Sequence, residues 1–201
     1  MKTFVIAVDG IAGSGKSTLA KKLGKKLGAE IVHTDDFSNW ENPFNWWRSF
    51  TNKVLEPIKS GATTLNYPRT TWYEGGERTP IQDQPVTDFM IIEGVGVLRV
   101  ELRPYIDFAI FTFVDEDEAL KRGTKRDSGN YGKTTDAELQ KLWLKWVEAE
   151  SRYFKDDKPK EYANIVVDGT KPFEIDKIAK MIKIKKEAQL DSKAPNGLKE
   201  E

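Results

Sequence analysis

Cysteine is absent from the 201 residues of this chain, and histidine occurs only once, as His33. These absences exclude disulfides, zinc–thiolate sites, cysteine nucleophiles and multi-histidine metal sites. No stretch approaches the ~18 consecutive apolar residues of a membrane-spanning helix, and the N-terminal segment lacks the long apolar region and the small-residue cleavage site of a signal peptide. We therefore expect a cytoplasmic protein with no membrane partner.

Neither positive nor negative charge is in excess. The chain carries 32 basic residues (Lys and Arg) and 32 acidic residues (Asp and Glu), so its formal net charge is zero. A dedicated nucleic-acid binder usually shows a basic excess. The composition therefore predicts no nucleic-acid partner.

Apolar runs typical of buried strands alternate along the chain with segments of helical period. This alternation predicts an α/β protein in which a parallel five-stranded sheet carries helices on both faces. The length fits a single domain, expected over residues 1–185, with 186–201 as a frayed tail. Strands are expected at 3–8, 30–34, 89–92, 107–114 and 164–167, and helices at 16–28, 42–61, from 115, at 137–154 and at 172–184.

A glycine-rich motif follows the first expected strand. Residues Gly10–Ser17 match the pattern G-x-x-x-x-G-K-[ST] in full. Its glycines let successive backbone N–H groups point at one anion, and the following helix adds its N-terminal dipole. A chance glycine-rich turn is the alternative, but the strand before the motif and the helix after it are the context that a P-loop requires. The motif predicts a three-layer P-loop NTPase fold that binds ATP and Mg²⁺.

The P-loop pattern also predicts roles for individual residues. Lys16 can bridge the β- and γ-phosphates, and the Ser17 hydroxyl can ligate Mg²⁺. The residues expected to hold the nucleotide phosphates are Gly10, Ala12, Gly13, Ser14, Gly15, Lys16, Ser17 and Thr18.

Acidic residues follow two further expected strands. Glu93 ends the strand at 89–92, where one carboxylate acting through water is enough to organise Mg²⁺; the alternative is a surface acid. Asp35 and Asp36 follow His33, which we interpret as a strand residue rather than a base. A kinase needs one carboxylate to orient and deprotonate the attacking hydroxyl. Adjacent side chains of an extended chain point in different directions, so one of the two aspartates would serve, unless the pair only caps a turn.

Two arginines precede a segment with two glycines, residues 127–135, that could close as a short lid. Arg122 and Arg126 are four residues apart and share one helix face. On spacing alone, a solvated run of charges is the favoured interpretation.

The segment at 61–87 is rich in threonine, proline and glycine, which predicts a β-hairpin or an irregular insertion. Trp72 and Tyr73 interrupt its polar stretch and are candidates for lining an acceptor pocket. An equally favoured interpretation is that the two side chains form a small satellite core. Four other tryptophans lie at helical spacing and are expected in the core: Trp46, Trp47, Trp143 and Trp146.

Taken together, these motifs resemble the uridine kinase-like branch of P-loop kinases, which also includes phosphoribulokinase and bacterial pantothenate kinase. The matching segments fall in family order within about residues 3–170. They are the P-loop, Thr34-Asp35-Asp36-Phe37, Ile91-Ile92-Glu93-Gly94, Arg122-x-x-x-Arg126-Asp127 and Ala163–Gly169.

The resemblance implies further roles. The family pattern D-[SNDG]-[FY] puts the catalytic aspartate at Asp35. Lys16 is a second expected catalytic residue. It makes Arg122 an adenine-stacking residue and Arg126 a catalytic clamp on the transferring phosphoryl group, with Gly169 bordering the adenine. The residues implied on the acceptor side are Asp35, Phe37, Tyr67 and Trp72.

One departure from the family concerns the acceptor. Many relatives carry an aspartate at the place of Thr71, and the short lid lacks a further arginine. The resemblance therefore supports an ATP-dependent small-molecule kinase better than it supports uridine itself. A nucleoside such as uridine or cytidine is the expected acceptor, and a pantothenate- or sugar-like molecule is the alternative. A P-loop ATPase or a regulatory nucleotide-binding module is a further alternative. A GTPase is excluded, because Asn52-Lys53 is not part of an N-K-x-D motif.

Overall fold

The computed structural model describes residues 2–72, 78–127 and 136–192. Its centre is a five-stranded sheet with the strand order β2-β5-β1-β6-β7, in which every neighbouring pair is parallel. This confirms the predicted sheet. The strands are β1 (Phe4–Gly10), β2 (Glu30–His33), β5 (Phe89–Glu93), β6 (Phe108–Phe113) and β7 (Ile165–Asp168).

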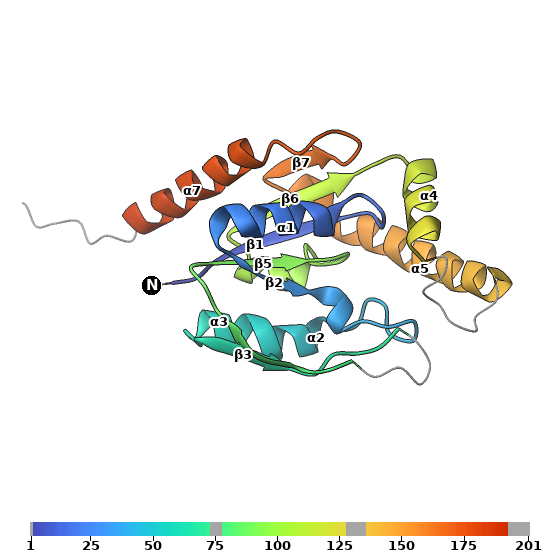
Figure 1. Ribbon diagram of the computed structural model, residues 1–201, viewed down its shortest axis with the longest axis horizontal. Coiled ribbons are helices and arrows are strands. Elements are labelled where there is room, and N and C mark those ends of the chain that lie inside the picture. Colours follow the sequence, from blue (N-terminus) through green and yellow to red (C-terminus); the bar gives the residue numbers. More distant parts are fainter. Residues whose placement is uncertain (1, 73–77, 128–135, 193–201) are drawn as a thin grey trace, which may run out of the picture.

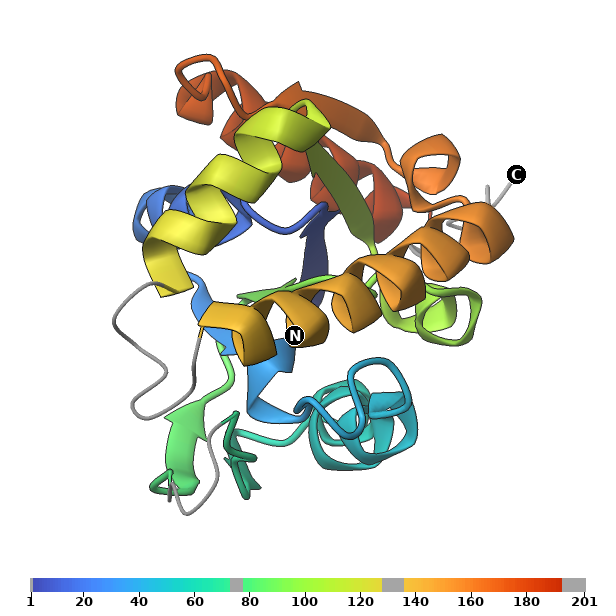
Figure 2. The ribbon, with the colours of Figure 1, turned by 90° about the vertical axis from the view of Figure 1, so that its right-hand side faces the viewer.

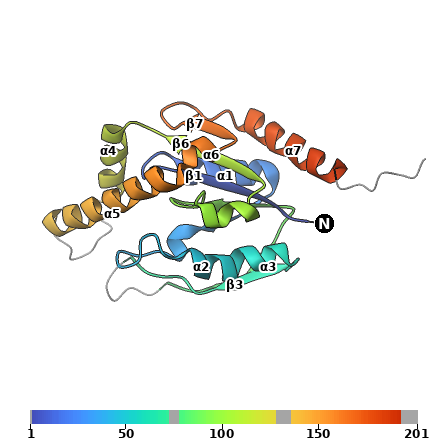
Figure 3. The same cartoon turned by 180° about the vertical axis from the view of Figure 1, so that it is seen from behind.

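Helices cover both faces of the sheet (Figure 1 and Figure 3). Alternate residues of β1 point to opposite faces: Phe4, Ile6 and Val8 join one apolar core, and Val5 and Ala7 join the other. The first face carries α1 (Lys16–Leu27) and α7 (Ile175–Asp191). The second carries α2 (Trp47–Phe50), a π-helical turn (Thr51–Leu55) and α3 (Glu56–Lys59). The result is the predicted three-layer architecture.

The register of the sheet gathers particular residues at its carboxyl edge. Gly10 pairs with Thr112, His33 pairs with Glu93, and Asp168 pairs with the last residue of β6. Figure 2 views this edge, and α5 (Asp136–Asp157) crosses in front of it. In open parallel sheets, ligands bind at this edge.

The helix expected to begin at Asn42 begins instead at Trp47. The prediction was wrong because asparagine side chains form local turns here. Asn39 Oδ1 accepts the N–H of Asn42, and Asn42 Oδ1 accepts the N–H of Asn45. Such side-chain bonds compete with helical ones.

Several other elements refine the predicted chain path. The segment at 61–87 contains an antiparallel pair, β3 (Thr64–Tyr67) and β4 (Ile81–Pro85). Three short helices of the described residues were not predicted: 3₁₀ helices at Thr34–Asp36 and Val100–Tyr105, and α6 at Pro159–Tyr162. The last helix, α7, continues to Asp191 rather than ending at 184, so part of the expected tail is helical.

The expected lid, residues 127–135, lies outside the described residues except for Asp127, at which α4 (Glu116–Asp127) ends. Tyr73 also lies outside them. Within the described ranges, no helix combines the length and the apolar character needed to cross a bilayer.

Candidate active site

The P-loop joins the end of β1 to the start of α1. Gly15 stands at the N-cap of α1 and has no side chain to cap it, so the first-turn N–H groups are left for a ligand or water. The buried ammonium of Lys16 donates to the carbonyl oxygens of Gly10 at 3.0 Å and Ile11 at 2.8 Å. A fixed positive charge and a helix N-terminus therefore lie together, as anion binding requires.

Two glycines make this arrangement possible. Gly13 has φ +80°, and a Cβ there would lie 2.7 Å from the carbonyl oxygen of Ala119 in α4. A Cβ at Gly169 would lie 2.1 Å from the carbonyl oxygen of Ser14. A side chain at either position would therefore push α4 or the loop after β7 away from the P-loop.

Ser17 and Glu93, the predicted Mg²⁺ residues, are in direct contact. The Ser17 hydroxyl donates to Glu93 Oε1 at 3.1 Å, and His33 Nδ1 lies 2.5 Å from the same oxygen. Burial disfavours the charge of Glu93, but the hydrogen bond and charge of His33, with Lys16 and Ser17, hold its pKa below the usual value. The same hydrogen bond raises the pKa of His33. The strand-end acid is thus kept ionised beside the P-loop.

Asp35 and Asp36 have separate environments. The Asp36 carboxylate is buried and pairs through Oδ1 with Arg69 Nε at 2.9 Å and Arg78 Nη2 at 2.5 Å. Asp35 is exposed, and its carbonyl oxygen accepts hydrogen bonds from Trp72 Nε1 and Arg78 Nη1, both at 3.1 Å. Asp36 therefore fixes the turn, and Asp35 lies on its outer side.

Aromatic side chains gather beside Asp35. The ring of Trp72 lies 5.1 Å from that of Trp40 and 5.6 Å from that of Trp146, centroid to centroid. Trp146 is half-buried here rather than in the main core. We call Trp40, Trp72 and Trp146 the tryptophan cluster.

The other predicted tryptophans and acceptor residues lie elsewhere. Phe37 and Tyr67 are 7% and 3% exposed, and their rings pack together in the core, so either could reach an acceptor only by its edge. Trp46 is buried in the core and Trp47 packs against it at the margin, as expected. The side chain of Trp143 is outside the described part.

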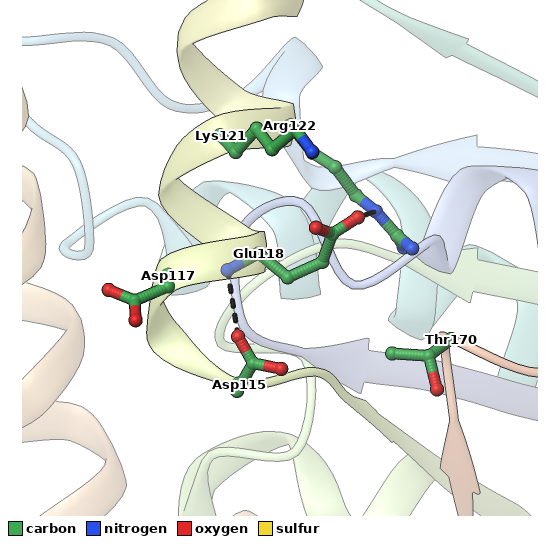
Figure 4. Close-up of a pocket in the computed structure, with 6 residues that line it drawn as sticks. All are labelled: Asp115, Asp117, Glu118, Lys121, Arg122 and Thr170. Carbon is green, nitrogen blue, oxygen red and sulfur yellow. Dashed lines mark hydrogen bonds and ion pairs between the residues drawn. The ribbon is translucent and has the colours of Figure 1, made fainter.

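Arg122 reaches from α4 to the loop after β7. Its Nε donates to Glu118 Oε1 at 2.6 Å and its Nη1 to the carbonyl oxygen of Gly169 at 3.0 Å. An open pocket of about 580 Å³ lies here (Figure 4), lined by Asp115, Asp117, Glu118, Lys121, Arg122 and Thr170. Arg122 is therefore half-buried and bonded rather than fully solvated. Arg126 belongs to α4, but its side chain is not among those described.

Three polar residues of the site were missed by the sequence analysis. The fully buried carboxylate of Asp9 accepts hydrogen bonds from the Tyr153 hydroxyl at 2.6 Å and from the N–H of Leu98 at 2.8 Å, yet burial still raises its pKa. Tyr153 and Glu150 both belong to α5. Glu150 accepts the N–H of Ala12 in the P-loop at 2.9 Å. The only sequence signal was the spacing of 150 and 153 on an amphipathic helix, which does not say what the helix covers.

The strand order, the P-loop between β1 and α1 and the helices on both faces define a P-loop kinase fold. No family model matches the chain. Among solved structures, one described as a possible uridine kinase from Bacillus stearothermophilus superposes with a TM-score of 0.58 at 21% identity, covering 84% of this chain and 90% of that one.

Curated relatives extend the comparison to sequence. A uridine kinase of Clostridium novyi is 25% identical over 185 residues, covering 83% of this chain and 88% of that protein. A uridine kinase of Limosilactobacillus reuteri is 26% identical, with 74% and 79% covered. A cytidylate kinase of Ignicoccus hospitalis is 27% identical, with 81% and 88% covered. Over most of its length the chain is thus similar in sequence to uridine kinases, and the resemblance predicted from its motifs is confirmed.

Proposed function

We propose that this protein transfers the γ-phosphoryl group of ATP to a hydroxyl of a small molecule, with a nucleoside such as uridine or cytidine as the expected acceptor. One observation carries the proposal. The exposed Asp35 follows β2 at the same carboxyl edge of the sheet as the P-loop, and its carbonyl oxygen accepts a hydrogen bond from Trp72 of the tryptophan cluster. A candidate base therefore lies beside both a phosphate site and a surface suited to a planar ring.

The residues present fit ATP and Mg²⁺. Gly15 leaves the start of α1 without a side-chain cap, Lys16 supplies the charge, and Arg122 with Gly169 borders the pocket expected for adenine. Ser17 and the ionised Glu93 offer oxygen donors of the kind that Mg²⁺ prefers. Among the described residues, no cluster of three or more acidic or histidine side chains could hold a metal, so the nucleotide would complete the coordination. Bound Mg²⁺ would neutralise charge on the β- and γ-phosphates.

The chain's own residues then have separable roles. Asp35 accepts the proton of the acceptor hydroxyl, whose oxygen attacks the γ-phosphorus as the bond to the β-bridging oxygen breaks. Lys16 stabilises the charge on that bridge. Arg126 is proposed to clamp the transferring group, and Arg122 to hold the base. Asp36 positions Asp35 through Arg78, which binds the Asp36 carboxylate and donates to the Asp35 carbonyl oxygen.

A second acceptor class is favoured by a specific observation. Arg78 donates to the Asp35 carbonyl oxygen, and Arg69 and Arg78 both bind the Asp36 carboxylate, so two guanidinium groups lie on the acceptor side. Thr71 also stands where many related kinases carry an aspartate. An acceptor with a carboxylate or phosphate, such as a pantothenate- or sugar-phosphate-like molecule, could bind these guanidinium groups through charge-assisted hydrogen bonds.

The test is an ADP-release assay with Mg²⁺ and ATP, run without acceptor and with nucleosides, pantothenate, sugars and sugar phosphates. We expect release that depends on a nucleoside. Dependence on an anionic acceptor instead would favour the second class. Release that no acceptor accelerates would contradict a kinase function and favour a P-loop ATPase.

A further inference from the structure

One face of α5 contacts both sides of the site. Trp146, Glu150 and Tyr153 are spaced i, i+4 and i+7, so they share a face of the helix. That face crosses the carboxyl edge of the sheet (Figure 2). Trp146 belongs to the tryptophan cluster beside Asp35, and Glu150 bonds to Ala12 of the P-loop. The helix therefore bridges the acceptor side and the phosphate side.

Glu150 is unusual because it is an acid of α5 that bonds to a loop expected to hold anions. Its side chain is buried, and its carboxylate takes the N–H of Ala12 at 2.9 Å. It faces Asp9 at the end of β1 and Lys16 at the start of α1. Burial raises the pKa of Glu150; the nearby charge of Asp9 adds to this, and Lys16 opposes it. Two anions near one amide repel each other strongly when water is excluded.

We propose that Glu150 occupies a P-loop amide until nucleotide phosphates arrive, and that its displacement is passed along α5 to the tryptophans beside Asp35. This inference rests on the proposed function and deepens it. Glu150 is then a positioning residue that couples nucleotide binding to the state of the acceptor side. Tyr153, one turn further along, anchors the helix to Asp9 at 2.6 Å and gives the movement a fixed end.

The first test measures binding of Mg²⁺ complexes of ADP and of the ATP analogue AMP-PNP by calorimetry. Glu150→Gln keeps an oxygen for the Ala12 amide but removes the charge. It should bind AMP-PNP roughly tenfold more tightly than wild type, with a smaller gain for ADP, which carries one charge fewer. The matched control is Glu148→Gln on the same helix, an exposed glutamate paired with Arg152, which should bind as wild type does.

Unchanged or weaker binding of AMP-PNP by Glu150→Gln would overturn the inference. So would equal gains for both nucleotides. If wild-type protein binds neither nucleotide, the proposed function itself fails, which keeps the two failures distinguishable.

The second test follows intrinsic tryptophan fluorescence as AMP-PNP binds. Wild type should show a change that Trp146→Phe largely removes while still binding the nucleotide. Glu150→Ala, which cuts the contact with Ala12, should bind without the change. A full change in Glu150→Ala, or none in wild type, would refute transmission along α5. If Glu150→Ala does not fold, the calorimetric comparison of Glu150→Gln still decides whether Glu150 competes with phosphate.

Discussion

The phosphate side of this site is held mainly by main chain, whereas the acceptor side is held by side chains from distant segments. Lys16 bonds to two carbonyl oxygens of its own loop. On the acceptor side, Asp36 depends on Arg69 and Arg78, and the ring of Trp72 packs against Trp146 of α5. The first arrangement is local in the chain, and the second requires three segments to fold together.

This difference predicts different consequences of mutation. A change in the P-loop should affect phosphoryl transfer to any acceptor, because every acceptor uses the same donor. A change on the acceptor side should affect proton transfer, folding or the choice of acceptor separately. The substitutions below test whether the two sides are as separable as their construction suggests.

The largest effect is expected for Lys16→Ala. No other described residue places a buried ammonium against the P-loop carbonyl oxygens, so the variant should lose roughly 10³-fold or more in turnover. The measurement is ADP release with the best acceptor from the screen. Lys21→Ala, an exposed lysine of the same helix, is the control and should retain activity. Near-normal turnover in Lys16→Ala would contradict the P-loop role.

On the acceptor side, Asp35→Asn should lower kcat by about 10²–10⁴-fold, the usual contribution of a general base. Binding of Mg·AMP-PNP should be nearly intact, because the carboxylate is not proposed to hold the nucleotide. Parallel calorimetry and kcat measurements check both statements. Loss of nucleotide binding in Asp35→Asn would make Asp35 part of the phosphate side and would break the separation of the two sides.

The same contrast explains how much could be predicted from the sequence. The strands and the P-loop are local patterns: β1 is an apolar run followed at once by Gly10–Ser17, and both were placed correctly. The start of the helix after Asn42 was misplaced: Asn42 Oδ1 accepts the N–H of Asn45, as a cap does, but the helix begins only at Trp47.

Long-range contacts could not be predicted in the same way. The hydrogen bond of Ala12 to Glu150 joins residues 138 positions apart. The bond between His33 and Glu93 depends on the strand register that pairs them. His33 was interpreted as a strand residue, and it does end β2, but no local pattern shows which acid its ring will meet. Such contacts follow from strand order and helix placement, which a single sequence does not fix.

A smaller effect, on stability rather than chemistry, is expected for Asp36→Asn. The carboxylate is 3% exposed and its two arginine partners are 28% and 27% exposed. Removing one partner of a buried ion pair costs several kcal/mol, and partial exposure of the arginines reduces this to about 2–3 kcal/mol. Chemical denaturation measures the free energy of unfolding. Asp88→Asn, whose side chain is 61% exposed, should change it little. A stable Asp36→Asn variant with a kcat defect larger than that of Asp35→Asn would reverse the assigned roles.

Asp9, near the end of β1, departs from the comparison as Ala12 does, because it lies on the phosphate side yet bonds to a side chain of α5. Burial raises its pKa above the usual 3.8, opposed by the hydrogen bond from Tyr153. The native state therefore holds the Asp9 proton more tightly than the unfolded chain, and this group's contribution to stability falls as pH rises from about 3.8 to its native pKa.

Tyr153→Phe removes a hydrogen bond that favours the Asp9 carboxylate, so it should raise the pKa of Asp9 further. Above the native pKa of Asp9, the free energy of unfolding should drop by about 1–2 kcal/mol, and the drop should shrink as pH falls through that pKa. Denaturation of wild type and Tyr153→Phe between pH 5 and 8 tests this, with Tyr162→Phe, at 37% exposed, as a control that should show no such trend. A loss that is the same at every pH would contradict a role for Tyr153 in favouring the ionised form of Asp9.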